Sequence, residues 1–235
     1  MTFVLVHGGG FGASCWDLLT PLLDGPVIAV DLPGRGSRPA DLSTIGIADF
    51  VDAVVDDLVT RDLHDVILVG HSLAGVTLPG VAGRAPDRVA RIVFVSCAVP
   101  PHGTSVAEIL SALSPAVAEA AARLGDGMIS ETGGLHPDLA AVMFCNDMDE
   151  AQIDFTLSRM GSEAPGAISQ PVDLTGMPAG IPRTYVRLLQ DESLTLATQD
   201  QMICNLGGAE VIDLDAGHMA MISQPAQLAD ILNAL

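Results

Sequence analysis

The stretch Val66-Ile67-Leu68-Val69-Gly70-His71-Ser72-Leu73-Ala74-Gly75 is a short apolar run that leads into a serine among small residues. A buried strand that continues into a helix through such a serine is typical of a nucleophile elbow. The serine of an elbow lies in a strained turn, so the residues two before and two after it must be small. Gly70 and Ala74 meet this condition, although glycine is the usual residue at the second position. We therefore predict that Ser72 is a nucleophile at the carboxyl end of a strand.

Other apolar runs of similar length recur along the chain, each bounded by Gly, Pro or Asp and separated by segments of helical periodicity. This alternation is typical of βαβ units and a parallel sheet. The predicted strands are Phe3–Val6, Val27–Val30, Val66–Val69, Ile92–Val95, Thr184–Leu188 and Glu210–Leu214. Apolar residues recur at three- and four-residue steps from Ile47 to Val59, which predicts an amphipathic helix on the sheet. The fold class is therefore α/β, with about six mostly parallel strands flanked by helices.

Residues 100–180 interrupt this alternation, because helical pieces follow one another there without a clear strand. The predicted pieces are Val106–Leu113, Ala116–Leu124, Pro137–Phe144 and Glu150–Arg159. From Pro165 to Pro182 the chain is rich in proline and glycine, which predicts an extended return to the sheet. We expect a single domain, with a core of residues 1–99 and 181–235 and a helical cap of residues 100–180.

The charge and the hydropathy of the chain limit which partners it can bind and where in the cell it is expected. The 235 residues hold 29 acidic residues and 10 arginines but no lysine, for a formal net charge of −19. This charge makes nucleic acid and anionic membrane surfaces unfavourable partners. The longest apolar runs are far shorter than the ~20 residues that span a bilayer. The N-terminal residues also lack the basic segment with which a signal peptide begins. We expect a cytoplasmic protein without a membrane partner.

Four cysteines are scattered along the chain without the spacing of a metal site, and they are Cys15, Cys97, Cys145 and Cys204. Apolar residues make up 49% of the sequence, enough for a large core that needs no disulfide staples. We expect free thiols in a reducing compartment and no bound metal.

A serine hydroxyl is a weak nucleophile until a base takes its proton, so a histidine is required. His218 is the candidate, because it lies just past the last predicted strand, where a loop can bring its ring over Ser72. His7 and His71 adjoin the site but are expected to have structural roles. The remaining histidines are predicted at a helix end and in the cap, and they are His64, His102 and His136.

The acid that orients this histidine is expected between the serine and the histidine. Enzymes with a serine elbow keep the chain order Ser, Asp or Glu, His, and the acid follows a strand. Asp191 meets both conditions, directly after the predicted strand Thr184–Leu188. Its carboxylate would select the imidazole tautomer and stabilise the imidazolium. The alternatives are Glu192, Asp213 and Asp215.

Acyl transfer also requires an oxyanion hole, which is commonly made of two backbone N–H groups. The N–H of Leu73 follows the nucleophile at the start of a helix, where the helix dipole favours negative charge. The second N–H is expected from the glycine-rich loop after the first strand, at Gly9, with Gly10 as the alternative. This loop does not fit a dinucleotide-binding pattern, and a chain without lysine has no phosphate-binding P-loop. The turn DLPGRG at 31–36 is predicted to be structural.

The chain resembles a known family in the strings FVLVHGGGFGASCW, DLPGRGSR, GHSLAG, MFCNDMDE, LLQDESLT and GHMAMISQP, in this order and nearly from end to end. They are similar to the α/β hydrolases related to plant methyl esterases and hydroxynitrile lyases. The resemblance implies the α/β-hydrolase fold, a six-strand parallel core, a small helical cap, no metal and no organic cofactor.

Three positions depart from the lyase members of this family. The lyases carry a threonine just after the first strand and a lysine directly after the triad histidine, where this chain has Gly8 and Met219. They tend to have cysteine after the nucleophile, where this chain has Leu73. The methyl-esterase-like members carry glycine and methionine at the first two places, so the resemblance favours hydrolysis.

We therefore predict a serine hydrolase that cleaves a small, largely apolar carboxylic ester, or a related carbamate or lactone, through Ser72, His218 and Asp191. The candidate wall residues of its pocket are Phe11, Trp16, Cys97, Phe144, Met148 and Met219. One alternative is a lyase, lactonase or cyclisation enzyme of secondary metabolism that uses the same site. Another is a non-catalytic small-ligand binding protein on a hydrolase fold. The expected partner is the small-molecule substrate, and assembly as a homodimer stays open.

Overall fold

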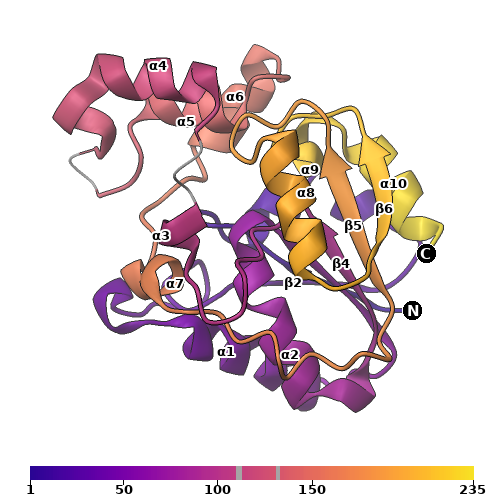
Figure 1. The fold of residues 1–235 in the computed structure, drawn as a ribbon. Coiled ribbons are helices and arrows are strands. Elements are labelled where there is room, and N and C mark those ends of the chain that lie inside the picture. Colours follow the sequence, from indigo (N-terminus) through magenta and orange to yellow (C-terminus); the bar gives the residue numbers. More distant parts are fainter. Residues whose placement is uncertain (110–112, 131–132) are drawn as a thin grey trace.

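Parallel strands form one sheet in the order β2-β1-β3-β4-β5-β6 (Figure 1). The computed structural model describes residues 1–109, 113–130 and 133–235. The strands of this described part are β1 Phe3–Val6, β2 Val27–Val30, β3 Val66–His71, β4 Val89–Val95, β5 Arg183–Leu188 and β6 Glu210–Leu214. The predicted fold class is confirmed.

Three strands are longer than the apolar runs that predict them. β3 continues to His71, β4 begins at Val89 and β5 begins at Arg183. Arg91 interrupts the apolar pattern of β4, but its guanidinium donates a hydrogen bond to Thr184 on the neighbouring strand at 2.9 Å. The polar residue therefore stays in the sheet because the next strand supplies its partner.

The carboxyl ends of the strands meet at one edge of the sheet. Val6 of β1 pairs with Gly70 of β3, and His71 of β3 pairs with Val95 of β4. All the strand pairs are parallel, so every strand reaches this edge in the same direction. The loops that follow the strands are thereby gathered in one place, as in other open parallel sheets.

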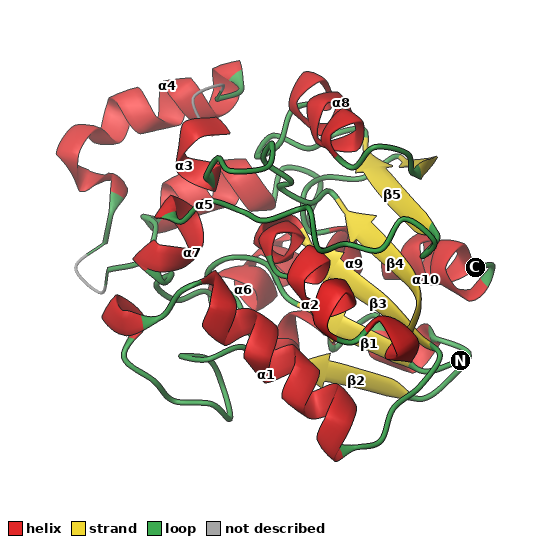
Figure 2. Ribbon diagram, turned by 60° about the horizontal axis from the view of Figure 1, so that its bottom comes forward, coloured by secondary structure: helices red, strands yellow, loops and turns green. Residues whose placement is uncertain are grey.

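Helices cover both faces of the sheet (Figure 2). The helices on one face are α1 Ile47–Thr60, α2 Leu78–Arg84 and α8 Leu196–Asn205. Those on the other face are η1 Ala13–Trp16, α9 Ala220–Ser223 and α10 Pro225–Asn233. Further short 3₁₀ turns are η2 Thr20–Leu22, η3 Leu42–Thr44, η4 Ser72–Val76, η5 Pro86–Arg88 and η6 Gly125–Met128.

Helix α1 shows why the periodic stripe in its sequence predicts a surface helix. Phe50, Val54 and Leu58 recur at four-residue steps and are buried against the sheet, while Asp52 and Asp56 lie on the exposed face. The Asp49 carboxylate accepts a hydrogen bond from the N–H of Gly46 at 2.8 Å and thereby caps the first turn.

The segment between β4 and β5, which we call the cap (residues 100–180), is mostly helical. Its helices are α3 Val106–Ile109, α4 Pro115–Leu124, α5 Pro137–Phe144, α6 Glu150–Leu157 and α7 Pro165–Ser169. Figure 1 shows α4, α5 and α6 beyond the carboxyl ends of the strands. In the described ranges no helix is long and apolar enough to cross a membrane.

Two of the cap predictions differ from the structure. The predicted helix Val106–Leu113 is described only at α3 and at Leu113, because residues 110–112 lie outside the described ranges. The predicted extended return from Pro165 to Pro182 is wrong at its start, where α7 forms. Pro165 stands at the first turn of α7, where a missing N–H costs nothing, and Ala167 is buried. Tertiary burial therefore outweighs the proline and glycine content.

Candidate active site

Ser72 sits in a tight turn between β3 and the 3₁₀ helix η4. Its φ is +52°, a conformation that a non-glycine residue adopts only under constraint. A Cβ at Gly70 would lie 2.6 Å from Leu78 Cδ1 and 2.9 Å from the Cβ of Ala74. The strand and the following helix therefore approach as closely as the sequence pattern requires. The turn exposes the Ser72 side chain at the edge of the sheet.

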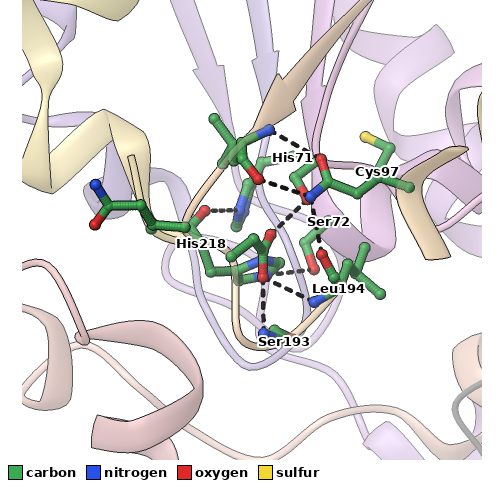
Figure 3. A network of polar contacts seen from close by, with 12 residues as sticks. His71, Ser72, Cys97, Ser193, Leu194 and His218 are labelled. Carbon is green, nitrogen blue, oxygen red and sulfur yellow. Dashed lines mark hydrogen bonds and ion pairs between the residues drawn. The ribbon is translucent and has the colours of Figure 1, made fainter. Parts of the chain in front are cut away.

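A continuous hydrogen-bond chain links Ser72, His218 and Asp191. The Nε2 atom of His218 lies 2.9 Å from Ser72 Oγ, and its Nδ1 atom lies 2.6 Å from Asp191 Oδ2. The side chains of His218 and Asp191 are 1% and 0% exposed. With Nδ1–H donating to the carboxylate, Nε2 is free to accept the Ser72 proton. Figure 3 shows His218 beside Ser72, on the edge of the sheet that also carries Ser193 and Leu194.

The Asp191 carboxylate is held from several sides. Its Oδ1 accepts hydrogen bonds from the N–H groups of Ser193 and Leu194, both at 2.7 Å. Its Oδ2 accepts a third hydrogen bond from the hydroxyl of Ser96 at 2.6 Å, besides the one from His218. These bonds satisfy a buried charge and leave the carboxylate one orientation.

Ser96 is a site residue that the sequence reasoning missed. It follows β4 directly, and its φ is +39°. Its place after a strand puts it at the same edge of the sheet as Ser72 and Asp191. That placement is a signal that could have identified it, but a lone serine in the string VSCAV carries no motif.

The alternative acids lie away from the His218 ring or are engaged elsewhere. Asp213 makes a two-pronged ion pair with Arg187, at 2.8 and 2.9 Å, and Asp215 accepts a hydrogen bond from Gln190 at 2.7 Å. Glu192 neighbours Asp191 but makes no contact with His218 in the described part of the chain. Asp191 is the acid that the fold brings to the histidine.

The two predicted oxyanion donors, Gly9 and Leu73, line the same cavity as Ser72. Leu73 is the second residue of η4, and among the described residues neither its N–H nor that of Gly9 has an acceptor within the protein. The N–H of Gly10 is instead donated to Glu163 Oε2 at 2.7 Å. The structure thus separates the two candidates for the second oxyanion donor, since Gly9 keeps a free N–H and Gly10 does not.

His7 supports the glycine-rich loop that follows β1. Its Nε2 accepts a hydrogen bond from the N–H of Leu32 at 3.2 Å, so Nδ1 carries the proton and donates to the carbonyl of Gly8 at 2.9 Å. Burial lowers the pKa of His7 to about 4, which keeps the ring neutral. The Gly8 carbonyl and the Gly9 N–H belong to one peptide unit, so this bond also orients the Gly9 N–H.

His71 holds the backbone of the residue that acts on Ser72. Its Nε2–H donates to the carbonyl of His218 at 2.8 Å, and the two ring centroids lie 4.6 Å apart. Burial, followed by the nearby His218 ring, holds the pKa of His71 well below its usual value. The expectation that His7 and His71 are structural fits these contacts.

A cavity of about 570 Å³ opens above Ser72 and His218. Aliphatic, aromatic and thioether side chains from both the core and the cap line most of it, and they include Phe11, Leu73, Val106, Ile129, Leu135, Met143, Phe144, Met160, Ile168 and Leu194. Most of the polar lining residues lie at the sheet edge around Ser72, and Glu163 and Ser169 of the cap are the others. An apolar cavity with a few convergent polar groups is the usual form of a small-molecule site.

The structure places the six predicted wall residues differently. Phe11 and Phe144 line the cavity and meet edge to face, with ring centroids 5.8 Å apart. The other four do not line it, and they are Trp16, Cys97, Met148 and Met219. Trp16, Cys97 and Met219 are wholly buried in the core. Met148 accepts a hydrogen bond from Thr156 within the cap. Nearness to a motif in sequence therefore does not decide which way a side chain points.

The four cysteines are unpaired, as expected of free thiols. Cys15, Cys97 and Cys145 are buried and Cys204 is exposed. Burial raises the pKa of the Cys15 and Cys97 thiols well above the usual range and that of Cys145 to about 11. These three thiols stay protonated and unreactive at neutral pH.

The fold and the site geometry agree with a known family. The family model described as the alpha/beta hydrolase family matches residues 3–231. This chain belongs to the alpha/beta hydrolase family. The match covers nearly the whole sequence, including the loops that carry Ser72, Asp191 and His218.

Individual relatives within this family are esterases and hydrolases by name. Methylesterase 9 of Arabidopsis thaliana is 29% identical over 98% of this chain and 96% of its own length. The pyrethroid hydrolase of Sphingobium wenxiniae is 25% identical over 97% of this chain and 85% of its own length. A solved structure of an extracellular alpha/beta-hydrolase from a Paenibacillus species is 26% identical, covers 99% of this chain and 97% of that one, and superposes with a TM-score of 0.82. These relatives support the predicted class of enzyme, an esterase-type hydrolase.

Proposed function

We propose that this chain is a serine hydrolase that cleaves a largely apolar carboxylic ester through Ser72, His218 and Asp191. The observation that carries the proposal is the unbroken hydrogen-bond chain from Asp191 through His218 to Ser72, at 2.6 and 2.9 Å, at the floor of an apolar cavity. A nucleophile, a base and an orienting acid in this order can perform acyl transfer.

The first half of the reaction transfers the acyl group to the enzyme. Ser72 Oγ attacks the carbonyl carbon of the ester while its proton moves to His218 Nε2. Asp191, held by Ser96, Ser193 and Leu194, stabilises the imidazolium that forms. His218 then gives the proton to the leaving alkoxide, so an alcohol departs and an acyl-Ser72 ester remains.

The free N–H groups of Gly9 and Leu73 stabilise the charge on the carbonyl oxygen during this step. Each such donor contributes on the order of 3 kcal/mol to transition-state stabilisation in comparable enzymes. In the second half, His218 takes a proton from water, the hydroxide adds to the acyl carbon, and the acid leaves as Ser72 regains its proton. The N–H groups serve the same oxygen in both halves.

The cavity indicates the kind of ester. A volume of about 570 Å³ lies within the range of pockets that bind drug-sized ligands, so the apolar part of the ester can be larger than an acetyl group. The names of the relatives, methylesterase and pyrethroid hydrolase, fit cleavage of such esters. Aliphatic and aromatic walls favour apolar groups over charged ones.

Two positions disfavour lyase chemistry at this site. A side chain at Gly8 would meet His71 Nδ1 at 2.8 Å and Ser72 Cβ at 2.9 Å, so the lyase threonine has no space here. Met219 is wholly buried and carries no charge toward the cavity, where the lyases place a lysine. Neither polar group of the lyase site is therefore available.

Labelling and mutation test the proposal. A fluorophosphonate should label Ser72 and no other residue, as read by mass spectrometry of the digested protein. Ser72→Ala should abolish both the labelling and the hydrolysis of p-nitrophenyl butyrate. In water labelled with oxygen-18, hydrolysis should place the isotope in the carboxylic acid product. The proposal is contradicted if Ser72 is not labelled, or if Ser72→Ala is as active as the wild type.

A further inference from the structure

The peptide groups of Gly10 are held from the cap side by residues 161–163. The N–H of Gly10 donates to Glu163 Oε2 at 2.7 Å, and the carbonyl of Gly10 accepts from the N–H of Gly161 at 2.7 Å. Gly10 has φ +75°, and a Cβ there would lie 3.1 Å from the Gly161 carbonyl. Two hydrogen bonds to Gly10 thus join the cap to the glycine-rich loop that follows β1.

The Glu163 carboxylate lies directly against the proposed oxyanion donors. Glu163 lines the cavity, and a Cβ on Gly9 would be 3.3 Å from Glu163 Oε2 and 3.1 Å from Leu73 Cδ2. By accepting the Gly10 N–H, Glu163 fixes the Gly9–Gly10 peptide unit and hence the direction of the chain at Gly9. His7 fixes the preceding peptide unit from the other side through the Gly8 carbonyl.

A bare carboxylate in this position would oppose catalysis, because it would repel the negative charge that develops on the substrate oxygen. Arg35 removes this conflict. Its Nη2 donates to Glu163 Oε2 at 3.0 Å, and the two side chains are only 9% and 14% exposed. The other carboxylate oxygen accepts from the N–H of Ala164 at 2.6 Å. The turn at 31–36, predicted to be structural, therefore delivers a cation to the edge of the site.

We propose that Glu163 is a positioning residue for the oxyanion hole and that Arg35 neutralises it, so that the cap aligns the Gly9 N–H without adding net charge. The role rests on the proposed function, because it concerns the same acyl transfer. Neither residue touches the reacting atoms. Both act through the backbone of Gly9 and Gly10.

The principal test compares Glu163→Ala with Glu163→Gln. Loss of an oxyanion donor lowers kcat by ~10²- to 10³-fold, and loss of its alignment in Glu163→Ala should cost about 10- to 100-fold. The amide oxygen of Glu163→Gln can still accept from Gly10 and Arg35, so this variant should stay within about threefold of the wild type. KM for p-nitrophenyl butyrate should change little in either variant, because ground-state binding relies on the apolar walls.

A transition-state analogue separates alignment from general damage. Ser72 adds to the carbonyl of 1,1,1-trifluoro-4-phenylbutan-2-one, the carbonyl π pair becomes a hemiketal oxyanion, and the serine proton passes to His218. The inhibition constant for this ketone should rise in Glu163→Ala in parallel with the fall in kcat/KM. Thermal unfolding should show that Glu163→Gln is folded.

Removal of Arg35 tests the neutralisation. Arg35→Met leaves the Glu163 charge uncompensated, so kcat should fall about tenfold, and the double variant Arg35→Met/Glu163→Gln should recover to within about threefold of Glu163→Gln. The matched control is Asp57→Asn, which removes a partly buried carboxylate paired with Arg38 at 2.9 Å, outside the cavity lining. This control should lower stability and leave kcat unchanged.

The outcomes separate the two levels of the proposal. An active wild type with Glu163→Ala equally active, or with Glu163→Gln as impaired as Glu163→Ala, would overturn the role of Glu163 alone. A double variant no better than Arg35→Met would overturn the role of Arg35. A wild type that neither hydrolyses the ester nor binds the ketone would overturn the proposed function together with this inference.

Discussion

The cavity has two walls of opposite character. The wall at the sheet edge is polar and is made by loops that follow strands, with Ser72, His218 and the Gly9 N–H group. The cap wall is mostly apolar and is made by residues between β4 and β5, such as Ile129, Met143 and Phe144, with Glu163 and Ser169 as its polar members. We infer that the sheet edge performs the chemistry and that the cap selects the substrate.

The two walls also differ in how tightly they are held. At the sheet edge, Ser72, Ser96 and His218 each make a hydrogen bond of 2.6 to 2.9 Å, and Asp191 accepts four. The cap wall is held mainly by apolar packing, with Phe144 stacked on the His218 ring at 5.4 Å between centroids. Substitutions at the edge should therefore change kcat, and substitutions of the apolar residues in the cap should change KM and substrate preference.

The largest effect should follow from Asp191→Asn. An amide in place of the carboxylate favours the wrong imidazole tautomer and removes the charge that stabilises the imidazolium, so kcat should fall by ~10³- to 10⁴-fold. Steady-state kinetics with p-nitrophenyl butyrate measures the change. The neighbouring Glu192→Gln serves as the matched control and should keep nearly full activity. The assignment of Asp191 fails if the control loses more activity than Asp191→Asn.

The next effect concerns pH and the buried His7, which holds the glycine-rich loop next to the sheet-edge wall. The pKa of His7 is about 4 in the folded chain against 6.5 in the unfolded chain, so the unfolded state binds the extra proton between these values. His7 thus stabilises the fold fully above pH 6.5, and about 3 kcal/mol of that stability is lost as pH falls toward 4. His71, whose pKa is also lowered, contributes with the same sign.

Urea unfolding at several pH values between 7 and 4 measures this loss. His7→Gln removes the titrating group while the amide can still donate to the Gly8 carbonyl. The free energy of unfolding should therefore depend less on pH in the variant than in the wild type. Equal pH dependence in both proteins would contradict the assigned burial and charge state of His7.

A smaller effect is expected at Ser96, whose hydroxyl donates a hydrogen bond to the Asp191 carboxylate. Ser96→Ala removes a hydrogen bond to a charged oxygen, and such a bond contributes about 1.5–3 kcal/mol, so kcat should fall about 10- to 150-fold with KM unchanged. The control is Ser114→Ala, a buried serine that caps α4 through the N–H of Val117. It should lower the melting temperature without lowering kcat. A change in KM alone at Ser96 would argue against its role at Asp191.

The smallest effect is expected in the cap wall. Ile129 lines the cavity and is 58% exposed, so Ile129→Ala should leave the fold intact and weaken contact with long acyl chains. One buried methylene contributes about 0.8 kcal/mol, so KM for p-nitrophenyl octanoate should rise about fourfold, while KM for the acetate should hardly change. Met128→Ala, which is exposed but does not line the cavity, is the control. Equal effects on both esters would contradict selection by the cap.

The strands of the core could be predicted well because their signal is local. β1, β2 and β6 have the predicted bounds, and the runs of β2 and β6 each end directly before an aspartate, Asp31 and Asp215. The predicted β4 misses the residues from Val89 to Arg91, because Arg91 interrupts the apolar run and its partner Thr184 lies far away in sequence. The proline and glycine content of the region from Pro165 to Pro182 predicts an extended chain throughout, because composition does not reveal that Ala167 of α7 is buried.

The sequence by itself determined the elbow at Ser72 and pointed to His218, because small residues around a serine and a glycine-histidine pair after the last strand are local patterns. Only the tertiary structure decided among Asp191, Glu192, Asp213 and Asp215, and between Gly9 and Gly10. It also added Ser96, Glu163 and Arg35 to the site through their contacts. Of the predicted wall residues, it showed that Phe11 and Phe144 line the cavity and that the others do not. Hydrogen bonds such as Gly10 to Glu163 join residues more than a hundred positions apart, so the distance along the chain hides the partner that folding supplies.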